Sequence, residues 1–255
     1  MKIISWNVNG LRAVHRKKFL TEFLAQEKPD LFLLQEIKAE LSKLQDFPAI
    51  FPEFAQYYNP AQKPGYAGTA IWARQKTSGQ FLADFPNDLE GRVTRIDLPK
   101  RVTVLSIYFP NGGKSKEAFQ GKLQFYRQVL HYVNTLRRKG HRLIFAGDFN
   151  CAHTEIDLAR PRENENSIGF LPVERAWLTR YLQAGWLDVW RSKNPTKREV
   201  YSWWHLITRA RARNVGWRID YFFLDQALLP QVKKVTYLTH QMGSDHCPVA
   251  LEINP

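Results

Sequence analysis

Cysteine is scarce in this chain of 255 residues, which contains only Cys151 and Cys247. Two isolated cysteines provide neither a disulfide framework nor a zinc-ligand cluster, and they fit a reduced intracellular setting. Long apolar runs are also lacking, so no segment reaches the length of a membrane span. The first residues, MKIISWNV, read as strand-like sequence and not as a signal peptide. We therefore expect a soluble, cytoplasmic protein that does not act at a membrane.

The sequence also lacks a Gly/Ser-rich linker, a low-complexity segment and a solenoid repeat. The simplest interpretation is one domain over residues 1–255, which is long enough to bury a substantial core. Acidic residues are outnumbered, because 24 Asp and Glu stand against 37 Lys and Arg and give a net charge of +13. This surplus favours a polyanionic partner, most commonly nucleic acid, although a basic protein without such a partner is the alternative.

Both helices and strands are predicted. Runs rich in β-branched and aromatic residues predict strands at 2–8, 31–35, 68–73, 92–98, 102–109, 142–147, 219–224 and 249–253. Apolar residues at helical spacing predict helices over 16–28, 117–139 and 174–184. Because strands and helices alternate irregularly, the fold class is α/β or α+β.

Polar side chains stand at the ends of several of these strands. The run LIFAGDFN, for example, ends in Asp148 and Asn150. Similar groups end other strands at Asn7, Glu36, Tyr108 and Asn111, and begin strands at Asp220, Asp245 and His246. A single case is most often a turn or a cap. The repetition predicts that these groups converge on one edge, with the last two strands antiparallel to the others.

Such convergence would place several carboxylates side by side. Like charges so placed cannot all stay ionised without a cation, and oxygen ligands without a thiol or a His cluster favour Mg²⁺ or Mn²⁺. A hard divalent ion in a basic protein suggests phosphate ester chemistry, since the ion can polarise a phosphoryl oxygen and neutralise the leaving oxygen. Hydrolysis further needs a group that activates water and donors for the non-bridging oxygens.

Taken together, SWNVNGLRA, LLQEIKA, YFPNGG, GDFNCAHTEIDLARP, VGWRIDYFFLD and GSDHCPV resemble the exonuclease III family of apurinic/apyrimidinic (AP) endonucleases, from residue 3 to residue 253. The resemblance implies a four-layer sandwich in which two packed mixed β-sheets are flanked by helices. It also implies a Mg²⁺-dependent enzyme that nicks DNA 5′ to an abasic site and leaves a 3′-hydroxyl. The accompanying 3′-phosphodiesterase, 3′-phosphatase and 3′→5′ exonuclease activities vary among members.

The resemblance also implies roles for individual residues. The metal ligands would be Glu36 first, with Asp245, Asn7, Asn9, Asp148 and Asn150 nearby. Some relatives have Asp where Asn9 stands, so the number of bound metal ions, one or two, is left open. The catalytic set would be Asp148 activating water, Asn150 orienting it, His246 on the scissile phosphate and held by Asp220, and Tyr108, Asn7 and Asn111 around the phosphate.

Substrate contacts follow from the same resemblance. The walls of a pocket for the flipped-out abasic sugar would be Trp203, Trp217 and Ile219, for which core packing is the alternative. The contacts to DNA would be Lys114, Ile207, Asn164, Arg12, Lys63, Tyr66, Arg209, Arg211 and Arg213, for which a solvated charged face is the alternative. A glycine at Gly169 would leave space for internal abasic DNA.

The implied partner is double-stranded DNA with abasic sites or blocked 3′ ends, bound by a monomer. The nearest alternative is a 3′→5′ exonuclease and 3′-phosphatase of the same family with weak AP incision. A second is another phosphoesterase on this fold, such as an inositol-phosphate phosphatase, a sphingomyelinase or a deadenylase. A third is a DNA-binding protein without activity, against which the complete set of acid, amide and histidine residues argues.

Overall fold

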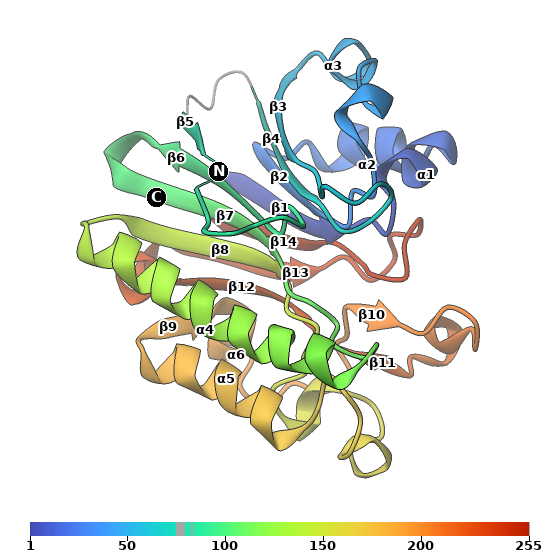
Figure 1. Ribbon diagram of the computed structural model, residues 1–255, viewed down its shortest axis with the longest axis vertical. Helices are drawn as coiled ribbons and strands as arrows, with labels where there is room; N and C mark the ends of the chain where they lie inside the picture. The colour runs from blue at the N-terminus through green and yellow to red at the C-terminus, as the bar shows by residue number, and fades with distance from the viewer. Residues whose placement is uncertain (75–79, 83, 255) are drawn as a thin grey trace.

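The computed structural model describes residues 1–74, 80–82 and 84–254. Two six-stranded mixed sheets pack face to face, and helices cover their outer surfaces (Figure 1). This arrangement confirms the predicted four-layer sandwich. Within the described part of the chain, no helix has the length and apolar character needed to cross a bilayer.

The first sheet has the order β13 (Val232–Tyr237), β14 (Val249–Ile253), β1 (Lys2–Asn7), β2 (Leu31–Gln35), β4 (Thr69–Arg74), β3 (Phe54–Asn59). The second has the order β5 (Gln80–Leu82), β6 (Val93–Leu98), β7 (Val102–Tyr108), β8 (Arg142–Asp148), β12 (Asp220–Asp225), β9 (Trp186–Asp188). A short ribbon pairs β10 (Trp203–Trp204) with β11 (Gly216–Trp217). Parallel pairing joins β1 to β2 and β7 to β8.

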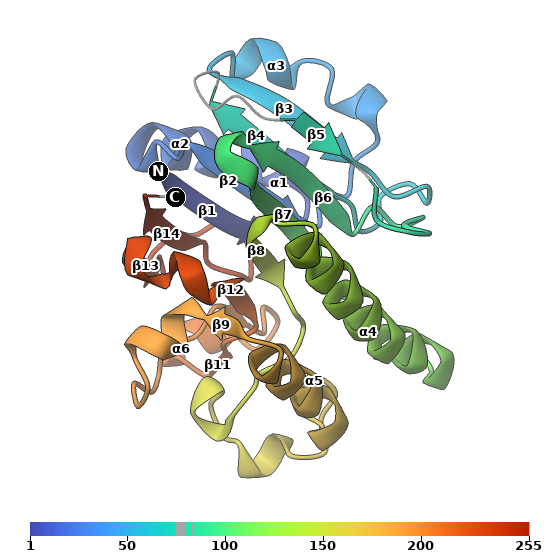
Figure 2. The ribbon, with the colours of Figure 1, turned by 90° about the vertical axis from the view of Figure 1, so that its left-hand side faces the viewer.

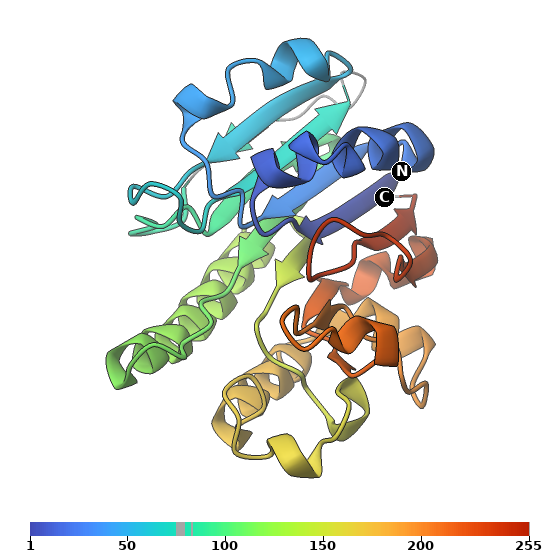
Figure 3. The same cartoon turned by 90° about the vertical axis from the view of Figure 1, so that its right-hand side faces the viewer.

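The helices divide between the two outer faces. The first sheet is covered by α1 (Leu11–Arg16), α2 (Phe19–Glu27) and α3 (Phe47–Ile50) (Figure 3). The second is covered by α4 (Lys116–Arg138) and α5 (Pro172–Gln183), and α6 (Val189–Lys193) packs near β12 and β13 (Figure 2). Single 3₁₀ turns lie at η1 (Leu41–Lys43), η2 (Pro99–Arg101), η3 (Glu155–Asp157), η4 (Arg162–Asn164), η5 (Ala210–Arg213) and η6 (Gln226–Gln231).

The helix predicted over 16–28 is present as α2, but it begins only at Phe19, because the chain turns at Lys17 and Lys18 and Lys18 has a left-handed φ of 65°. The separate helix α1 was not predicted. Burial accounts for it, because Leu11 and Val14 of α1 both pack into the core. Strand prediction also missed β3 and β13, whose outer positions carry polar or exposed residues.

Alternate residues of the central strands pack into different layers. Ile3 and Leu33 face the core between the sheets, whereas Ile4 and Leu34 face the helices. Strands buried on both faces read as continuous apolar runs, which is why they were recognisable in the sequence. The last two strand motifs run as predicted, since β12 is antiparallel to β8 and β14 is antiparallel to β1. The polar strand ends therefore meet at one edge of the sandwich, contributed by both sheets.

Candidate active site

The amide of Asn7 joins carboxylates from the two sheets. Its Nδ2 donates to Glu36 Oε1 and to Asp148 Oδ2, both at 2.9 Å. Asn7 ends β1 and Glu36 directly follows β2, whereas Asp148 ends β8 of the other sheet. One buried amide thus fixes the two acids beside each other.

Asp148 and Asn150 form a tight turn at the end of β8. The Asn150 backbone N–H donates to Asp148 Oδ1 at 2.7 Å, and Asn150 Nδ2 donates to Asp148 Oδ2 at 3.1 Å. The turn requires a left-handed φ of 50° at Asn150, which asparagine tolerates better than most residues. Burial raises the pKa of Asp148 to about 7, with the charges of Asp220 and Glu36 adding to the effect and that of His246 opposing it.

His246 lies between two carboxylates. Its Nδ1 is 2.8 Å from Asp220 Oδ2, and its Nε2 is 3.8 Å from Asp148 Oδ2. Burial favours the neutral ring, but the charges of Asp220 and Asp148 outweigh it and raise the pKa of His246 to about 10. The ring is therefore an imidazolium at neutral pH, oriented by Asp220.

Glu36 and Asp148 could hold a cation, because one oxygen from each and a ring nitrogen of His246 lie within 4.8 Å of one another. The two carboxylates suit a hard divalent ion, whereas the imidazolium of His246 is not a ligand and the side-chain oxygen of Asn7 accepts from the Asn9 N–H at 3.0 Å. Lys38 neutralises part of the negative charge of Glu36, because its Nζ lies 2.5 Å from Glu36 Oε2. Although burial opposes it, this neighbour lowers the pKa of Glu36.

Asp245 lies outside the group formed by Glu36, Asp148 and His246. Its Oδ1 accepts from Asn9 Nδ2 at 2.9 Å, and its Oδ2 accepts from Trp203 Nε1 at 3.1 Å. Lys38 Nζ donates to Asn9 Oδ1 at 2.6 Å and so connects Asn9 back to Glu36. The predicted ligands Asn9 and Asp245 thus adjoin the group without belonging to it.

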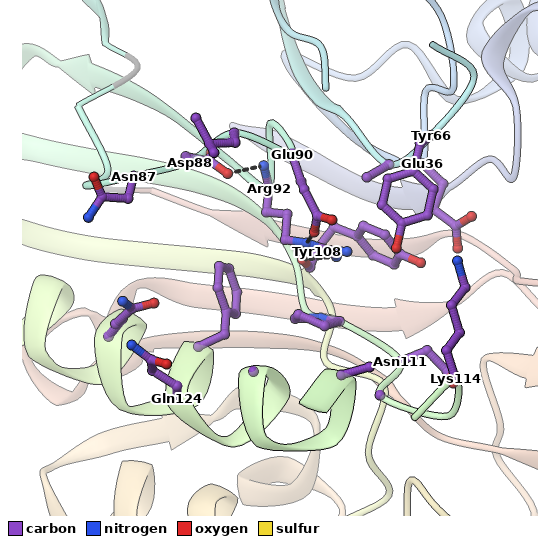
Figure 4. A pocket seen from close by; sticks show the side chains of 18 of the residues that line it. Glu36, Tyr66, Asn87, Asp88, Glu90, Arg92, Tyr108, Asn111, Lys114 and Gln124 are labelled. Atoms are coloured by element: carbon purple, nitrogen blue, oxygen red, sulfur yellow. Dashed lines mark hydrogen bonds and ion pairs between the residues drawn. The ribbon is translucent and has the colours of Figure 1, made fainter. Parts of the chain in front are cut away.

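A groove of about 940 Å³ extends from Glu36 along α4 (Figure 4). At its mouth the Tyr66 ring contacts the cations of Lys63, Lys114 and Arg92, at 5.5, 4.9 and 5.9 Å from the ring centroid. Burial raises the pKa of Tyr108, and the charges of Glu36 and Asp148 add to this shift, so its phenol remains a donor. Sequence reasoning missed Arg92, since an arginine that opens a strand carries no distinctive signal.

A second cavity of about 680 Å³ places the predicted pocket walls beside the acids. Trp203 and Trp217 lie perpendicular to each other at 6.3 Å, and both line the cavity together with Asp148 and His246. The two rings are half-buried, whereas Ile219 is buried beneath them. Ile219 also lines the cavity, so all three predicted wall residues lie there, and Ile219 packs in addition against the core residues Leu158 and Phe170.

Gly169 and Asn164 line the same cavity. Gly169 has φ of +94°, and a Cβ there would lie 3.2 Å from Trp217 Cζ3 and 3.3 Å from the Asn150 carbonyl oxygen. Both the backbone conformation and the space against the tryptophan thus require glycine. Asn164 Nδ2 donates to the Arg160 carbonyl at 2.9 Å and stabilises this loop.

Other predicted DNA contacts lie on the surface around the cavities. Arg12 is exposed on α1, and Ile207 and Arg209 are exposed on the loop between β10 and β11. Arg211 instead turns toward the protein, where it donates to the carbonyls of Thr239 and Gln241 at 2.9 and 2.6 Å. The Arg211 guanidinium thus stabilises the loop before Asp245, and its contact with DNA stays a prediction.

Comparison with known proteins gives a consistent result. Residues 4–246 match the model of the Endonuclease/Exonuclease/phosphatase family. The chain is 40% identical to an exodeoxyribonuclease of Bacillus subtilis, over 100% of both chains. It is 36% identical to the DNA repair nuclease APEX1 of Danio rerio, over 98% of this chain and 81% of the other.

Two solved structures extend the comparison. An AP endonuclease from Leishmania major has a TM-score of 0.92 at 27% identity, covering 100% of this chain and 88% of the other. The 3′-5′ exonuclease NExo from Neisseria meningitidis has a TM-score of 0.89 at 28% identity, with full coverage of both.

Proposed function

The chain belongs to the Endonuclease/Exonuclease/phosphatase family, and from that premise we propose that it hydrolyses the DNA phosphodiester 5′ to an abasic site, leaving a 3′-hydroxyl. The observation that carries the proposal is the cavity lined both by Asp148, Asn150 and His246 and by the tryptophans Trp203 and Trp217. A base-free deoxyribose would pack against these aromatic walls, which would exclude a complete nucleotide. An abasic nucleotide also costs less to extrude from the duplex than a paired one.

In the proposed reaction, Asp148 takes a proton from water that Asn150 orients. The water oxygen bonds to phosphorus while the bond to the upstream 3′ oxygen breaks. That oxygen takes up a proton from solvent to become the 3′-hydroxyl, and the abasic sugar keeps a 5′-phosphate. Cationic His246 and the phenol of Tyr108 donate to the non-bridging oxygens, where charge accumulates in the transition state, and Asn111 lies beside them.

Glu36 and Asp148 would hold Mg²⁺, with Asn7, Asn9 and Asp245 adjoining. When bound, the ion polarises the phosphoryl oxygen and neutralises the leaving oxygen. Mn²⁺ would fit the same oxygen ligands. Removing the ion with EDTA is therefore expected to abolish hydrolysis.

Duplex DNA would lie across both cavities. Contacts to its backbone would come from Lys114, Tyr66, Arg12 and Arg209, and Ile207 would insert into the duplex as an apolar wedge. The net charge of +13 supports association with a polyanion. We propose that the protein acts as a monomer in the cytoplasm and that the whole chain forms one catalytic domain.

Processing of 3′ ends is the second candidate function. The similarity in fold to the exonuclease NExo favours it, and the same phosphate-binding groups would serve a terminal phosphate. Gly169 distinguishes the candidates, because a side chain there would press on Trp217 and so disturb the pocket wall proposed for an internal site. We therefore propose that AP incision is the main activity and that 3′-phosphodiesterase, 3′-phosphatase and some 3′→5′ exonuclease activity accompany it.

The test uses a duplex that contains one tetrahydrofuran abasic analogue. The expected result with Mg²⁺ is a single nick 5′ to the analogue, and the expected result with EDTA is intact DNA. Degradation from the 3′ ends without that nick would instead support the exonuclease and phosphatase alternative.

A further inference from the structure

Lys122 lies on α4 close to the candidate active site, and its side chain is fully buried behind the backbone of the site loops. A buried ammonium costs several kcal/mol unless it is paired and hydrogen-bonded. Its Nζ is 2.5 Å from Glu174 Oε1, and it donates to the carbonyls of Asn150 at 2.7 Å and Asn111 at 3.0 Å. The ammonium therefore has two carbonyl acceptors and one paired carboxylate.

Glu174 is the buried partner on α5, and it continues the connection. Its other oxygen, Oε2, accepts from the backbone N–H groups of Gly169 at 2.8 Å and Leu171 at 3.1 Å. A single ion pair thus contacts the loop of Asn111, the loop of Asn150 and the loop of Gly169. Those loops carry the phosphate contact, the water-orienting amide and the pocket wall of the proposed function.

The loop of Asn150 depends on outside support. Asn150 has left-handed φ, and its neighbours contribute carbonyls that point away from the cavity into the protein. Tyr126, one helical turn after Lys122, donates its hydroxyl to the Phe149 carbonyl, and Tyr221 donates to the Cys151 carbonyl at 2.8 Å. Lys122 donates to the carbonyl between these two, that of Asn150. Through Glu174 it also fixes the Gly169 loop.

We propose that Lys122 and Glu174 are positioning residues that hold Asn150 in register with the Gly169 wall of the pocket, and that this register sets the rate of hydrolysis. Neither side chain reaches the cavity, so neither contacts the substrate. Close packing supports the assignment, because a Cβ on Gly112 would lie 3.0 Å from Lys122 Cδ. The inference deepens the proposed function and rests on it for the identity of the substrate.

The test compares Lys122→Met, Glu174→Gln and the double variant, assayed well below their unfolding midpoints. Misplacing a catalytic group by about 1 Å can cost about 100-fold in rate, so we expect Lys122→Met to lower kcat by about that factor with KM nearly unchanged. Because the residues act as one unit, the double variant is expected to lose no more than Lys122→Met alone. The neutral double variant also removes the unpaired buried charge, so it keeps the test valid if Lys122→Met fails to fold.

Val129→Ala is the matched control, since Val129 is fully buried on the same helix and lies in the core behind the second sheet. It is expected to lower the unfolding midpoint without changing kcat. The positioning role is overturned if the double variant keeps kcat within about threefold of the wild type, or if Val129→Ala loses as much kcat as the double variant.

The variants are assayed on the phosphate ester that the wild type hydrolyses. Should the wild type fail to nick abasic DNA but remove a 3′-phosphate, the proposed function fails, and the same comparison of variants on the 3′-phosphate still decides the positioning role. A loss confined to KM would also overturn it, because register of the water-orienting amide acts on the chemical step.

Discussion

The carboxylate of Asp148 is buried next to Asn7, Asn150 and His246, and its pKa of about 7 lets it take up a proton near neutral pH. Asp148→Asn keeps the shape of the side chain and an acceptor for Asn7. The amide cannot accept a proton from water, so we expect kcat to fall about 1,000-fold, within the range for losing a general base. Single-turnover kinetics would measure the loss, and binding of abasic duplex would serve as the control and stay near normal. Turnover within tenfold of the wild type would remove Asp148 from this role.

In the proposed function, Gly169 favours internal abasic DNA in the pocket. We expect Gly169→His to suppress abasic incision at least tenfold more than removal of a 3′-phosphate, because its side chain would displace Trp217 from the pocket wall. Gly169→Ala is the control, since it introduces the strain of positive φ with a much smaller side chain. Measuring both activities on each variant separates the effects. Equal losses of the two activities in Gly169→His would show that backbone geometry alone matters.

Residue types explain which site members were predictable. Asp148, Asn150 and His246 follow or precede apolar strands, where a polar group is unexpected, and so the sequence marks them. Lys122 and Glu174 lie in helices, where lysine and glutamate normally face solvent. Only the packing of α4 against α5 buries them, and nothing local in the sequence indicates that contact.

At the scale of elements, the loop between β10 and β11 carries the predicted wedge. Ile207 is 86% exposed, so replacing it costs the folded protein little. We expect Ile207→Ser to raise KM for abasic duplex about tenfold, as loss of an apolar contact in the duplex would, while the unfolding midpoint stays constant. Ile50→Ser on α3, an exposed apolar residue remote from β10 (Figure 1), is the control and should leave KM unchanged. An unchanged KM in Ile207→Ser would exclude the wedge.

A buried ion network connects the η3 turn to the strands beneath the pocket. Asp157 pairs with Arg191 of α6 and accepts from Arg218 Nε at 2.7 Å. Burial alone would raise the pKa of Asp157, but the guanidinium groups of Arg218 and Arg191 outweigh it and hold the pKa below its usual value. A lowered folded-state pKa stabilises the protein above the ordinary pKa of about 4 and loses that effect as pH falls below it.

Asp157→Asn is therefore expected to lower the free energy of unfolding by about 3 kcal/mol at pH 7, the cost typical of breaking a buried pair. The difference from the wild type should shrink as pH falls below about 4, because the unfolded chain then takes up a proton at Asp157 while the folded protein, with its lower pKa, stays ionised. Denaturant unfolding at pH 7, 5 and 3 measures both values. A difference that stays constant with pH would contradict the assignment of charge to this pair.

The helices show where sequence patterns give incomplete boundaries. The spacing of apolar residues located α4 nearly to the residue, and its Ser115 cap accepts from the Ala118 N–H at 3.1 Å. The same pattern began α2 at residue 16 and missed α1, because apolar spacing does not show the left-handed turn at Lys18. Tertiary burial of Leu11, not helix propensity, stabilises the six-residue α1.

At the scale of the whole molecule, the site exists because two sheets end at the same place. Strand polarity and antiparallel return of the last strands were predictable from the motifs at their ends. That the ends belong to different sheets was not derivable from the motifs themselves, since strand order depends on pairing between segments far apart in the chain. The resemblance to the exonuclease III family supplied this arrangement, and the two sheets confirm it.

Hydrolysis 5′ to an abasic site is tested most directly by product analysis after incision of a natural abasic duplex in ¹⁸O-labelled water with Mg²⁺. Attack of water on phosphorus predicts an upstream fragment with an unlabelled 3′-hydroxyl and a downstream fragment whose 5′-phosphate carries one ¹⁸O. Mass spectrometry resolves both fragments. An upstream fragment that ends in an unsaturated sugar, or a ladder of mononucleotides without the downstream abasic fragment, would contradict hydrolysis 5′ to the abasic site.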